Sequence, residues 1–422
     1  MMVLTRRSLA PTLETNGSAM TNSANGPDIR RLSEEEFEAW DHVTARAFGQ
    51  HSTVASRAYN RSILEVDRSI AAYADGRIIG TATAPTFGLT IPGGETALPL
   101  VDSVAVQPTH RRQGILRAMM AHQMDDFHER GEFVAGLFAS ESGIYGRFGY
   151  GIATWCEDWT MPREHSAFAG TPNAEGSFRF VEPDDVPSLW ASIYEPERPK
   201  RVGFLRFPEP VWPAFAADPE HERQRASAFF HVVYSGESGD EGFVTYRVRN
   251  DSQILVVMLL GTTPKAEAEL WRFCFGIDLM TSTFAPGRPV DDPLPWMLKD
   301  PRRLVRSLRD QLWLRLVDVP AALSARSYAS ECNVVLDVHD SFCPWNAGRF
   351  VLETGSGGAN CKQTSVSPDL ELSASDLASV YLGGTTLATL ERAGRVDEHR
   401  TGALRELDRA LATERSPWTV IF

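Results

Sequence analysis

The sequence has little cysteine, and its cysteines follow no metal or disulfide pattern. Five cysteines occur among 422 residues, and they are Cys156, Cys274, Cys332, Cys343 and Cys361. Their number is odd, no CxxC pair occurs, and no group of cysteines and histidines has the spacing of a zinc site. These absences exclude a disulfide framework, and they predict a protein of the reducing cytoplasm that holds no metal.

The sequence also lacks a hydrophobic run long enough to cross a membrane. The longest strongly apolar run, ILVVMLL at 254–260, is far shorter than the roughly 20 residues of a membrane helix, and it predicts a buried strand. TRRSLA at 5–10 resembles a twin-arginine export signal, but no continuous apolar segment follows it. We therefore expect residues 1–27 to form a disordered leader, with Met20 as an alternative start.

A surplus of positive charge is missing as well. Lysine and arginine total 42 against 55 aspartates and glutamates, which gives a net charge of −13. Proteins that bind nucleic acid need a basic face for the phosphates, so this balance argues against such a partner. It is compatible with a cationic substrate.

The chain length and the order of predicted elements indicate three consecutive blocks. At about 100–200 residues per domain, 422 residues allow two to four domains. In the first block, 28–160, Ser33 and Glu36 form a capping-box pattern, Asp75-Gly76 predicts a hairpin turn, and 114–131 has helical spacing. The second block, 175–300, repeats the same order of strands and helices. The third block, 305–422, has expected strands near LWLRLVDV, NVVLDVHD and GRFVLET, followed by helices.

The strongest local signal for chemistry is SVAVQPTHRRQGILRAMM at 103–120. A predicted strand runs into Arg111-Arg112-Gln113-Gly114, and a helix follows. Backbone N–H groups at the start of a helix attract anions, and a glycine lets a diphosphate approach the backbone closely. The alternative is an ordinary helix start with solvated arginines.

Two segments together resemble a known enzyme family. The loop at 111–117 resembles the pyrophosphate loop of the GCN5-related N-acetyltransferases. FASESGIYGRFGYGIAT at 138–154 resembles the signature of the Eis (enhanced intracellular survival) family, which acetylates amines of aminoglycosides and lysines with acetyl-CoA. The resemblance implies an α+β fold with two tandem acetyltransferase domains, the second degenerate, followed by a sterol-carrier-like domain. It also implies a homohexamer.

The resemblance assigns roles to individual residues. Tyr145 matches the proton donor, and the terminal carboxylate of Phe422 matches the proton acceptor. Positions that match acetyl-CoA contacts are Val104, Ala105 and Val106 on the strand, Arg112, Gln113, Gly114, Ile115, Leu116 and Arg117 in the loop, and Ser140 and Glu141 after the next strand.

The two proposed catalytic groups also have purely structural explanations. Tyr145 could be an aromatic packing residue beside Phe148 and Tyr150, and Phe422 could be a frayed chain end. A tyrosine with a pKa near 10 can nevertheless protonate a leaving thiolate. The final segment, SPWTVIF, is more apolar than solvated tails usually are, so we expect it to pack inward.

Three features bear on the acceptor. After the strand at 254–260, the second block reads TTPKAEAEL, without the glycine and arginines of a diphosphate loop, so we expect no acetyl-CoA there. The penultimate residue is Ile421, and GQHST after Phe48 has no carboxylate, whereas aminoglycoside-acetylating members have acids at these places. The acceptor therefore stays open between cationic small molecules and lysines. The alternative function is a non-catalytic protein that binds a lipid or another ligand through its C-terminal block.

Overall fold

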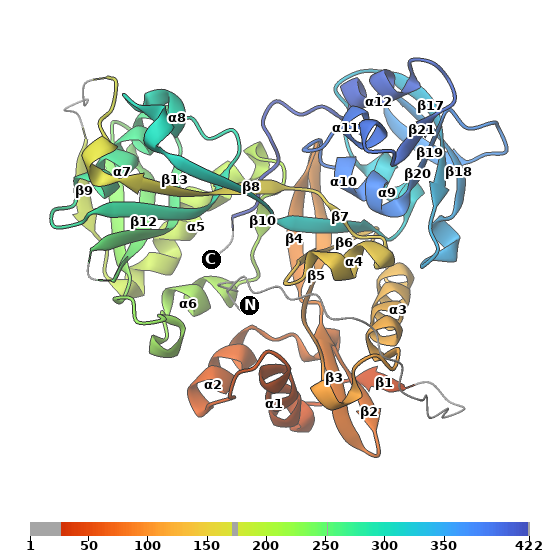
Figure 1. Ribbon diagram of the computed structural model, residues 1–422, viewed down its shortest axis with the longest axis horizontal. Coiled ribbons are helices and arrows are strands. Elements are labelled where there is room, and N and C mark those ends of the chain that lie inside the picture. Colours follow the sequence, from red (N-terminus) through yellow and green to blue (C-terminus); the bar gives the residue numbers. More distant parts are fainter. Residues whose placement is uncertain (1–26, 171–175, 251, 421–422) are drawn as a thin grey trace. The chain divides into compact units, whose positions relative to one another are not determined.

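The computed structural model describes residues 27–170, 176–250 and 252–420 (Figure 1). These residues fall into two compact units. Unit 1 comprises the residues up to Pro85 together with Val101–Asp126, and unit 2 comprises Thr86–Leu100 and the chain from Phe127 onward. The expected leader, except for Pro27, and the alternative start at Met20 lie outside the described residues.

Unit 1 is an antiparallel sheet with helices. Its strands pair in the order β1, β2, β3 and β5, and the turn between β2 and β3 has positive φ at Asp75 and Gly76, as the hairpin prediction requires. Helix α3 packs on β3, and a Cβ at Gly80 would lie 3.1 Å from the sulfur of Met119. The elements are β1 (Asp28–Arg31), α1 (Phe37–Ala47), α2 (Val54–Ile63), β2 (Ser69–Ala74), β3 (Arg77–Thr83), the end of β5 (Gly94–Val106) and most of α3 (Ile115–Glu129).

The first part of unit 2 consists of two small groups of strands. The start of β5 pairs with β4, which pairs with β10, while β16 lies between β6 and β7. These elements are β4 (Thr86–Ile91), β6 (Val134–Phe138), α4 (Ser142–Tyr145), β7 (Gly151–Ile152), β10 (Leu205–Arg206) and β16 (Leu312–Leu316).

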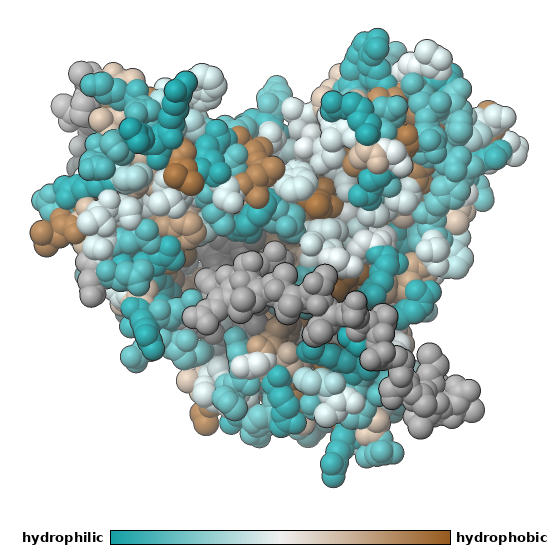
Figure 2. Space-filling view, in the orientation of Figure 1, coloured by the Kyte–Doolittle hydropathy of each residue, from teal (hydrophilic) through white to brown (hydrophobic). Residues whose placement is uncertain are grey.

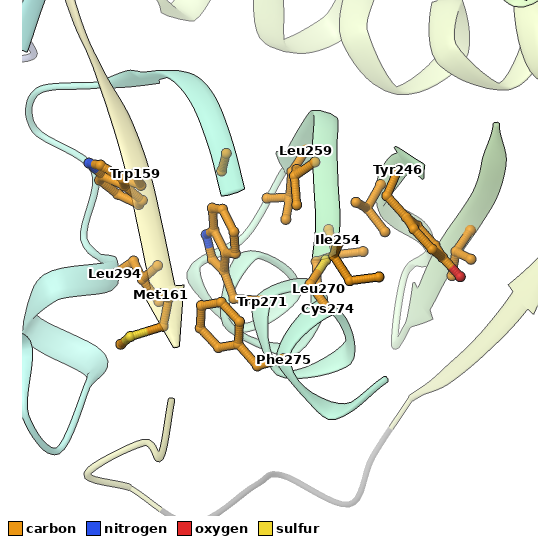
Figure 3. Close-up of a cluster of buried hydrophobic side chains, with 14 of the residues drawn as sticks. Trp159, Met161, Tyr246, Ile254, Leu259, Leu270, Trp271, Cys274, Phe275 and Leu294 are labelled. Atoms are coloured by element: carbon orange, nitrogen blue, oxygen red, sulfur yellow. The ribbon is translucent and has the colours of Figure 1, made fainter. Parts of the chain in front are cut away.

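A seven-stranded sheet follows, in the order β15, β8, β14, β13, β12, β11, β9. Helix α7 covers one face, and the core beneath it includes Trp271, whose ring centroid lies 5.8 Å from that of Trp159 and 5.6 Å from that of Phe275 (Figure 3). The expected buried strand at 254–260 is β13. The elements are β8 (Trp155–Pro162), β9 (Ser177–Phe180), α5 (Val186–Glu197), α6 (Val211–Ala216), β11 (Phe230–Gly236), β12 (Gly239–Arg249), β13 (Gln253–Gly261), α7 (Pro264–Gly276), β14 (Ser282–Pro289), α8 (Leu294–Met297) and β15 (Val305–Asp310).

The C-terminal part of unit 2 has a five-stranded sheet in the order β19, β18, β17, β20, β21. Its strands β17 and β20 run parallel, and the other pairs are antiparallel. The elements are α9 (Val319–Ala325), β17 (Cys332–His339), β18 (Gly348–Gly355), β19 (Gly358–Gln363), β20 (Leu370–Ser373), α10 (Ala374–Val380), α11 (Leu387–Arg392), β21 (Val396–Glu398) and α12 (Ala403–Leu411). The α+β class is confirmed.

One expected strand belongs to a different sheet from the one we assigned. We placed LWLRLVDV in the third block, but its residues 312–316 form β16, which pairs with β6 and β7 of the first block. In the same way, β15 pairs with β8. The reason is that neighbouring strands in a sheet need not be neighbours in sequence, and apolar alternation does not reveal the partner.

One face of the molecule is largely polar (Figure 2). The face shown in Figure 2 is mostly hydrophilic, with smaller hydrophobic areas. Among the described residues, no helix combines the length and the apolar character that a membrane span requires.

Candidate active site

In unit 1, the strand that leads to the predicted diphosphate loop carries a β-bulge. Thr81 pairs with Ala105 and Thr83 with Asp102, so β5 has one more residue than β3 across this interval. Within this interval Ser103 has a left-handed backbone conformation, with φ +52°, and its carbonyl oxygen accepts a 3.0 Å hydrogen bond from the Thr81 hydroxyl. A bulge interrupts strand pairing and redirects the chain. Of the residues matched to the pantetheine arm, Ala105 is buried, and Val104 and Val106 are half-buried.

The loop after β5 is open and lies at the start of a long helix. Arg111–Gly114 are exposed, and α3 begins at Ile115. Arg112 and Gly114 have φ values of +62° and +82°. No atom lies within 4 Å of a Cβ built on Gly114, so the space beside this glycine is empty of protein. The first-turn N–H groups have no acceptor within the helix, and this geometry suits an anion.

The remaining loop residues differ in exposure. Gln113 and Arg117 are exposed, Leu116 is half-buried, and Ile115 is buried in the core of unit 1. Ile115 therefore anchors the helix, while its backbone belongs to the exposed first turn.

In unit 2, Ser140, Glu141 and Tyr145 follow β6. Ser140 is half-buried, Glu141 is exposed, and the backbone N–H of Ile144 donates to the Glu141 carbonyl at 3.2 Å. Tyr145 ends the short helix α4, and the residue is 7% exposed. Its ring meets that of Tyr150 edge-on, with 6.1 Å between the centroids. Tyr145 is thus buried except for a small part, which is consistent either with packing or with a positioned acid.

The end of the described chain packs inward, as its composition predicted. The Trp418 indole donates to the Gly287 carbonyl at 2.7 Å, and the Gln311 side-chain amide binds the backbone of Thr419 through both its nitrogen (2.6 Å) and its oxygen (3.2 Å). A Cβ at Gly203 would lie 2.7 Å from the Trp418 carbonyl oxygen, so only glycine allows this approach. Val420 is buried too. The expected base, the carboxylate of Phe422, lies outside the described residues.

The predicted site residues therefore fall into two sets. Val104–Arg117 belong to unit 1, and Ser140, Glu141 and Tyr145 belong to unit 2. The first set has the strand, loop and helix start that its pattern predicts, and the second set follows a strand, as expected. In the part of the chain that the structure describes, no group of three histidine, cysteine, aspartate or glutamate side chains could hold a metal ion.

Comparison with known proteins identifies three consecutive domains. Residues 28–153 match a model of the acetyltransferase (GNAT) domain, 203–316 match a second such model, and 319–420 match a sterol carrier protein domain. N-acetyltransferase Eis of Mycobacterium tuberculosis is 37% identical over 350 residues, which cover 80% of this chain and 84% of that protein. The chain belongs to the Eis-like family of GCN5-related N-acetyltransferases.

Two further relatives of this Eis-like acetyltransferase extend over nearly the whole chain. An uncharacterized N-acetyltransferase of Streptomyces coelicolor is 40% identical, covering 92% of this chain and 98% of the relative. The crystal structure of Eis1 from Mycobacterium abscessus is similar with a TM-score of 0.80 and 34% identity, covering 93% of this chain and 99% of that one. The protein is an N-acetyltransferase, an enzyme class that uses acetyl-CoA, and the expectation of tandem GNAT domains followed by a sterol-carrier domain is confirmed. The alternative of a non-catalytic lipid-binding protein is not supported.

Sequence reasoning missed three residues that lie beside the candidate site segments of unit 2. Gln311 holds the chain end, Gly149 forms a left-handed turn after Tyr145, and Arg315 is fully buried beside that turn. Gly149 lies in a glycine-rich motif and could have been found from the rule that such turns favour glycine. No local sequence pattern predicted the roles of Gln311 and Arg315, because their hydrogen-bond and ion-pair partners are distant in sequence.

Proposed function

We propose that the protein transfers an acetyl group from acetyl-CoA directly to an amine, in a ternary complex without a covalent enzyme intermediate. The amine attacks the thioester carbon, the C–S bond breaks, and CoA leaves as a thiolate. In this proposal Tyr145 protonates the thiolate, and the carboxylate of Phe422 accepts the proton that the amine loses. Acetyl-CoA contacts residues 104–106, 112–117, 140 and 141.

The observation that carries the proposal is the open, positively charged loop at the start of α3. Its glycine has free space beside it, and its arginines are exposed, so a diphosphate would meet both N–H donors and cations there. This geometry, in a chain of the Eis-like family, favours acetyl-CoA binding in the first GNAT domain.

The corresponding turn of the second GNAT domain supports the proposal by contrast. There, a Cβ at Gly261 would lie 2.5 Å from the backbone nitrogen of Glu267, so the strand end is packed against the first turn of α7 and no space is left. The Glu241 carboxylate lies at this turn and accepts a 3.3 Å hydrogen bond from the Thr263 hydroxyl. A diphosphate would meet like charge here. We infer that the second domain does not bind acetyl-CoA and has a structural role.

The anchored tail supports the assignment of the base. Residues 418–420 are buried, and hydrogen bonds with Gln311, Gly287 and Val202 hold Trp418 and Thr419, so the described chain is fixed close to Phe422 in sequence. A terminal carboxylate has a pKa near 3.5 in water, and it becomes a useful base only when its surroundings raise that pKa.

The acceptor is an amine on a cationic small molecule, of which aminoglycosides are one class, or on a lysine. The net charge of −13 favours cationic substrates. We also propose a homohexamer located in the cytoplasm. No disulfide joins the five cysteines, all of which lie in described, buried positions, as expected of a reducing compartment.

The test is Tyr145→Phe, assayed by release of free thiol with a panel of amines. The substitution removes only the hydroxyl, so folding and acetyl-CoA affinity should persist. The turnover number kcat should fall by roughly 10²–10⁴, the usual contribution of a positioned acid. A near-wild-type kcat would show that Tyr145 is a packing residue.

A further inference from the structure

The turn that follows Tyr145 is pressed against residues from much later in the chain. Gly149 has φ +83°, and a Cβ there would overlap the guanidinium group of Arg315. Gly151 begins β7, and a Cβ there would overlap the carbonyl oxygen of Ser375 at the start of α10. Helix α10 packs against β7 (Figure 1). The backbone on both sides of Tyr150 therefore has almost no freedom to move toward these residues.

Arg315 owes its position to a buried ion pair. It lies on β16 with a fully buried side chain, and it pairs with Asp340, which follows β17 in the sterol-carrier domain. The other carboxylate oxygen of Asp340 accepts hydrogen bonds from the backbone N–H groups of Phe342 (3.0 Å) and Cys343 (2.9 Å). Buried ion pairs add little net stability, because the desolvation of both charges offsets their attraction. We therefore consider how the pair positions the Arg315 side chain against the turn at Gly149, rather than how much stability it adds.

Tyr150 connects this contact to Tyr145. The Ser375 hydroxyl donates to the Tyr150 carbonyl at 2.7 Å, and the Tyr150 N–H donates to the Tyr145 carbonyl at 3.3 Å. The Tyr150 ring packs against the Tyr145 ring, while its buried hydroxyl has no hydrogen-bond partner among the described residues. Burial raises the pKa of that hydroxyl, so Tyr150 stays neutral and serves to pack.

We infer that Arg315, Asp340 and Ser375, here called the loop clamp, are positioning residues for Tyr145. They hold the 149–151 turn, and the turn holds the proposed acid, so the sterol-carrier domain contributes to orienting the proton donor. The inference rests on the proposed role of Tyr145. A positioned general acid loses effect when it is displaced by even about 1 Å.

The test is a double-mutant cycle in the full-length protein. The pair Arg315→Met and Asp340→Asn removes both charges together, so no single buried charge is left behind, and the asparagine oxygen can still accept the two N–H bonds. Turnover with acetyl-CoA and an accepted amine should fall about 10- to 100-fold. Acetyl-CoA affinity, measured by calorimetry, should stay within about twofold, because most of its proposed contacts, residues 104–106 and 112–117, belong to unit 1.

The decisive measurement is the same pair of changes introduced into Tyr145→Phe. If the clamp acts through the Tyr145 hydroxyl, kcat should fall by less than about twofold in that background. An equal fall in both backgrounds would overturn the inference while leaving the acid assignment intact. An unchanged kcat in Tyr145→Phe alone would overturn both. If the paired variant does not fold, Ser375→Ala replaces it, because this substitution deletes only one hydroxyl. Ser375→Ala should lower kcat about two- to fivefold in the wild-type background and leave it unchanged in the Tyr145→Phe background. A fall in kcat that persists in Tyr145→Phe would refute the clamp.

Discussion

Gly114 offers the most direct experiment on the proposed acetyl-CoA site, because its substitution separates strain from ligand exclusion. Its φ of +82° disfavours any residue with a Cβ, and Gly114→Ala should cost about 1–2 kcal/mol of stability for that reason alone. Apart from the adjacent residues of the chain, the new methyl group would contact no protein atom, since no other atom lies within 4 Å of it. The protein should therefore fold, with a modestly lower Tm.

The effect on acetyl-CoA should be larger than this strain. A Cβ at Gly114 occupies the space through which a diphosphate would reach the backbone donors. Losing one charge-assisted hydrogen bond of about 1.5–3 kcal/mol corresponds to a roughly 10- to 100-fold weaker affinity. Isothermal titration calorimetry with acetyl-CoA measures it, and Gly114→Val, which adds more bulk, should bind still more weakly.

Gly76→Ala is the matched control. Gly76 lies in the same unit, has φ +73°, and also has no atom within 4 Å of a built Cβ. Its replacement should lower stability by a similar amount and leave acetyl-CoA affinity unchanged. The reasoning fails if Gly114→Ala binds acetyl-CoA like the wild type, or if Gly76→Ala loses as much affinity.

Three further predictions concern stability, the chain end and assembly. Burial and the nearby Asp292 raise the pKa of Glu267 to about 7, so the folded protein favours the neutral acid. The contribution of neutral Glu267 to the free energy of unfolding is present below about pH 4.5 and is lost as pH rises through 7. Glu267→Gln should therefore stabilise the protein by up to about 3 kcal/mol at pH 8 and by less than about 1 kcal/mol at pH 5, as measured by chemical denaturation. A pH-independent difference would contradict the assignment. Two glycines added after Phe422 should preserve folding and acetyl-CoA binding, abolish most acetylation near neutral pH and allow partial recovery at high pH; full activity would exclude the terminal carboxylate as base. Light scattering should give a particle several times 46.7 kDa, and a monomer at micromolar concentration would refute the hexamer.

Local patterns in the sequence predicted local structure well. The Asp75-Gly76 turn, the strand at 254–260, the loop before α3 and the inward packing of 418–420 are each encoded by residues within a few positions of one another. The motif at 138–154 predicted the family, because its glycines and aromatic residues lie within one short segment of the sequence. The roles of Tyr145 and Phe422 remain predictions, and so do the exact domain boundaries.

Long-range partners could not be predicted from the single sequence. An apolar pattern such as that of 312–316 predicts a buried or half-buried strand, but it does not predict which strand pairs with it. Arg315 illustrates the difficulty at the level of one side chain. In the sequence it is an arginine within an apolar strand, and only the fold brings Asp340 close enough to neutralise it.

The exchanged strands change how the three domains should be regarded. Because β16 lies between β6 and β7, the strand group that carries Tyr145 is incomplete without a segment about 160 residues further along the chain. That segment brings Arg315, whose buried charge would be uncompensated without Asp340 of the sterol-carrier domain. An isolated first GNAT domain would thus lack a central strand, and a protein ending after β16 would contain an unpaired buried cation. If the loop clamp positions Tyr145 as we infer, removing the sterol-carrier domain should impair acetyl transfer.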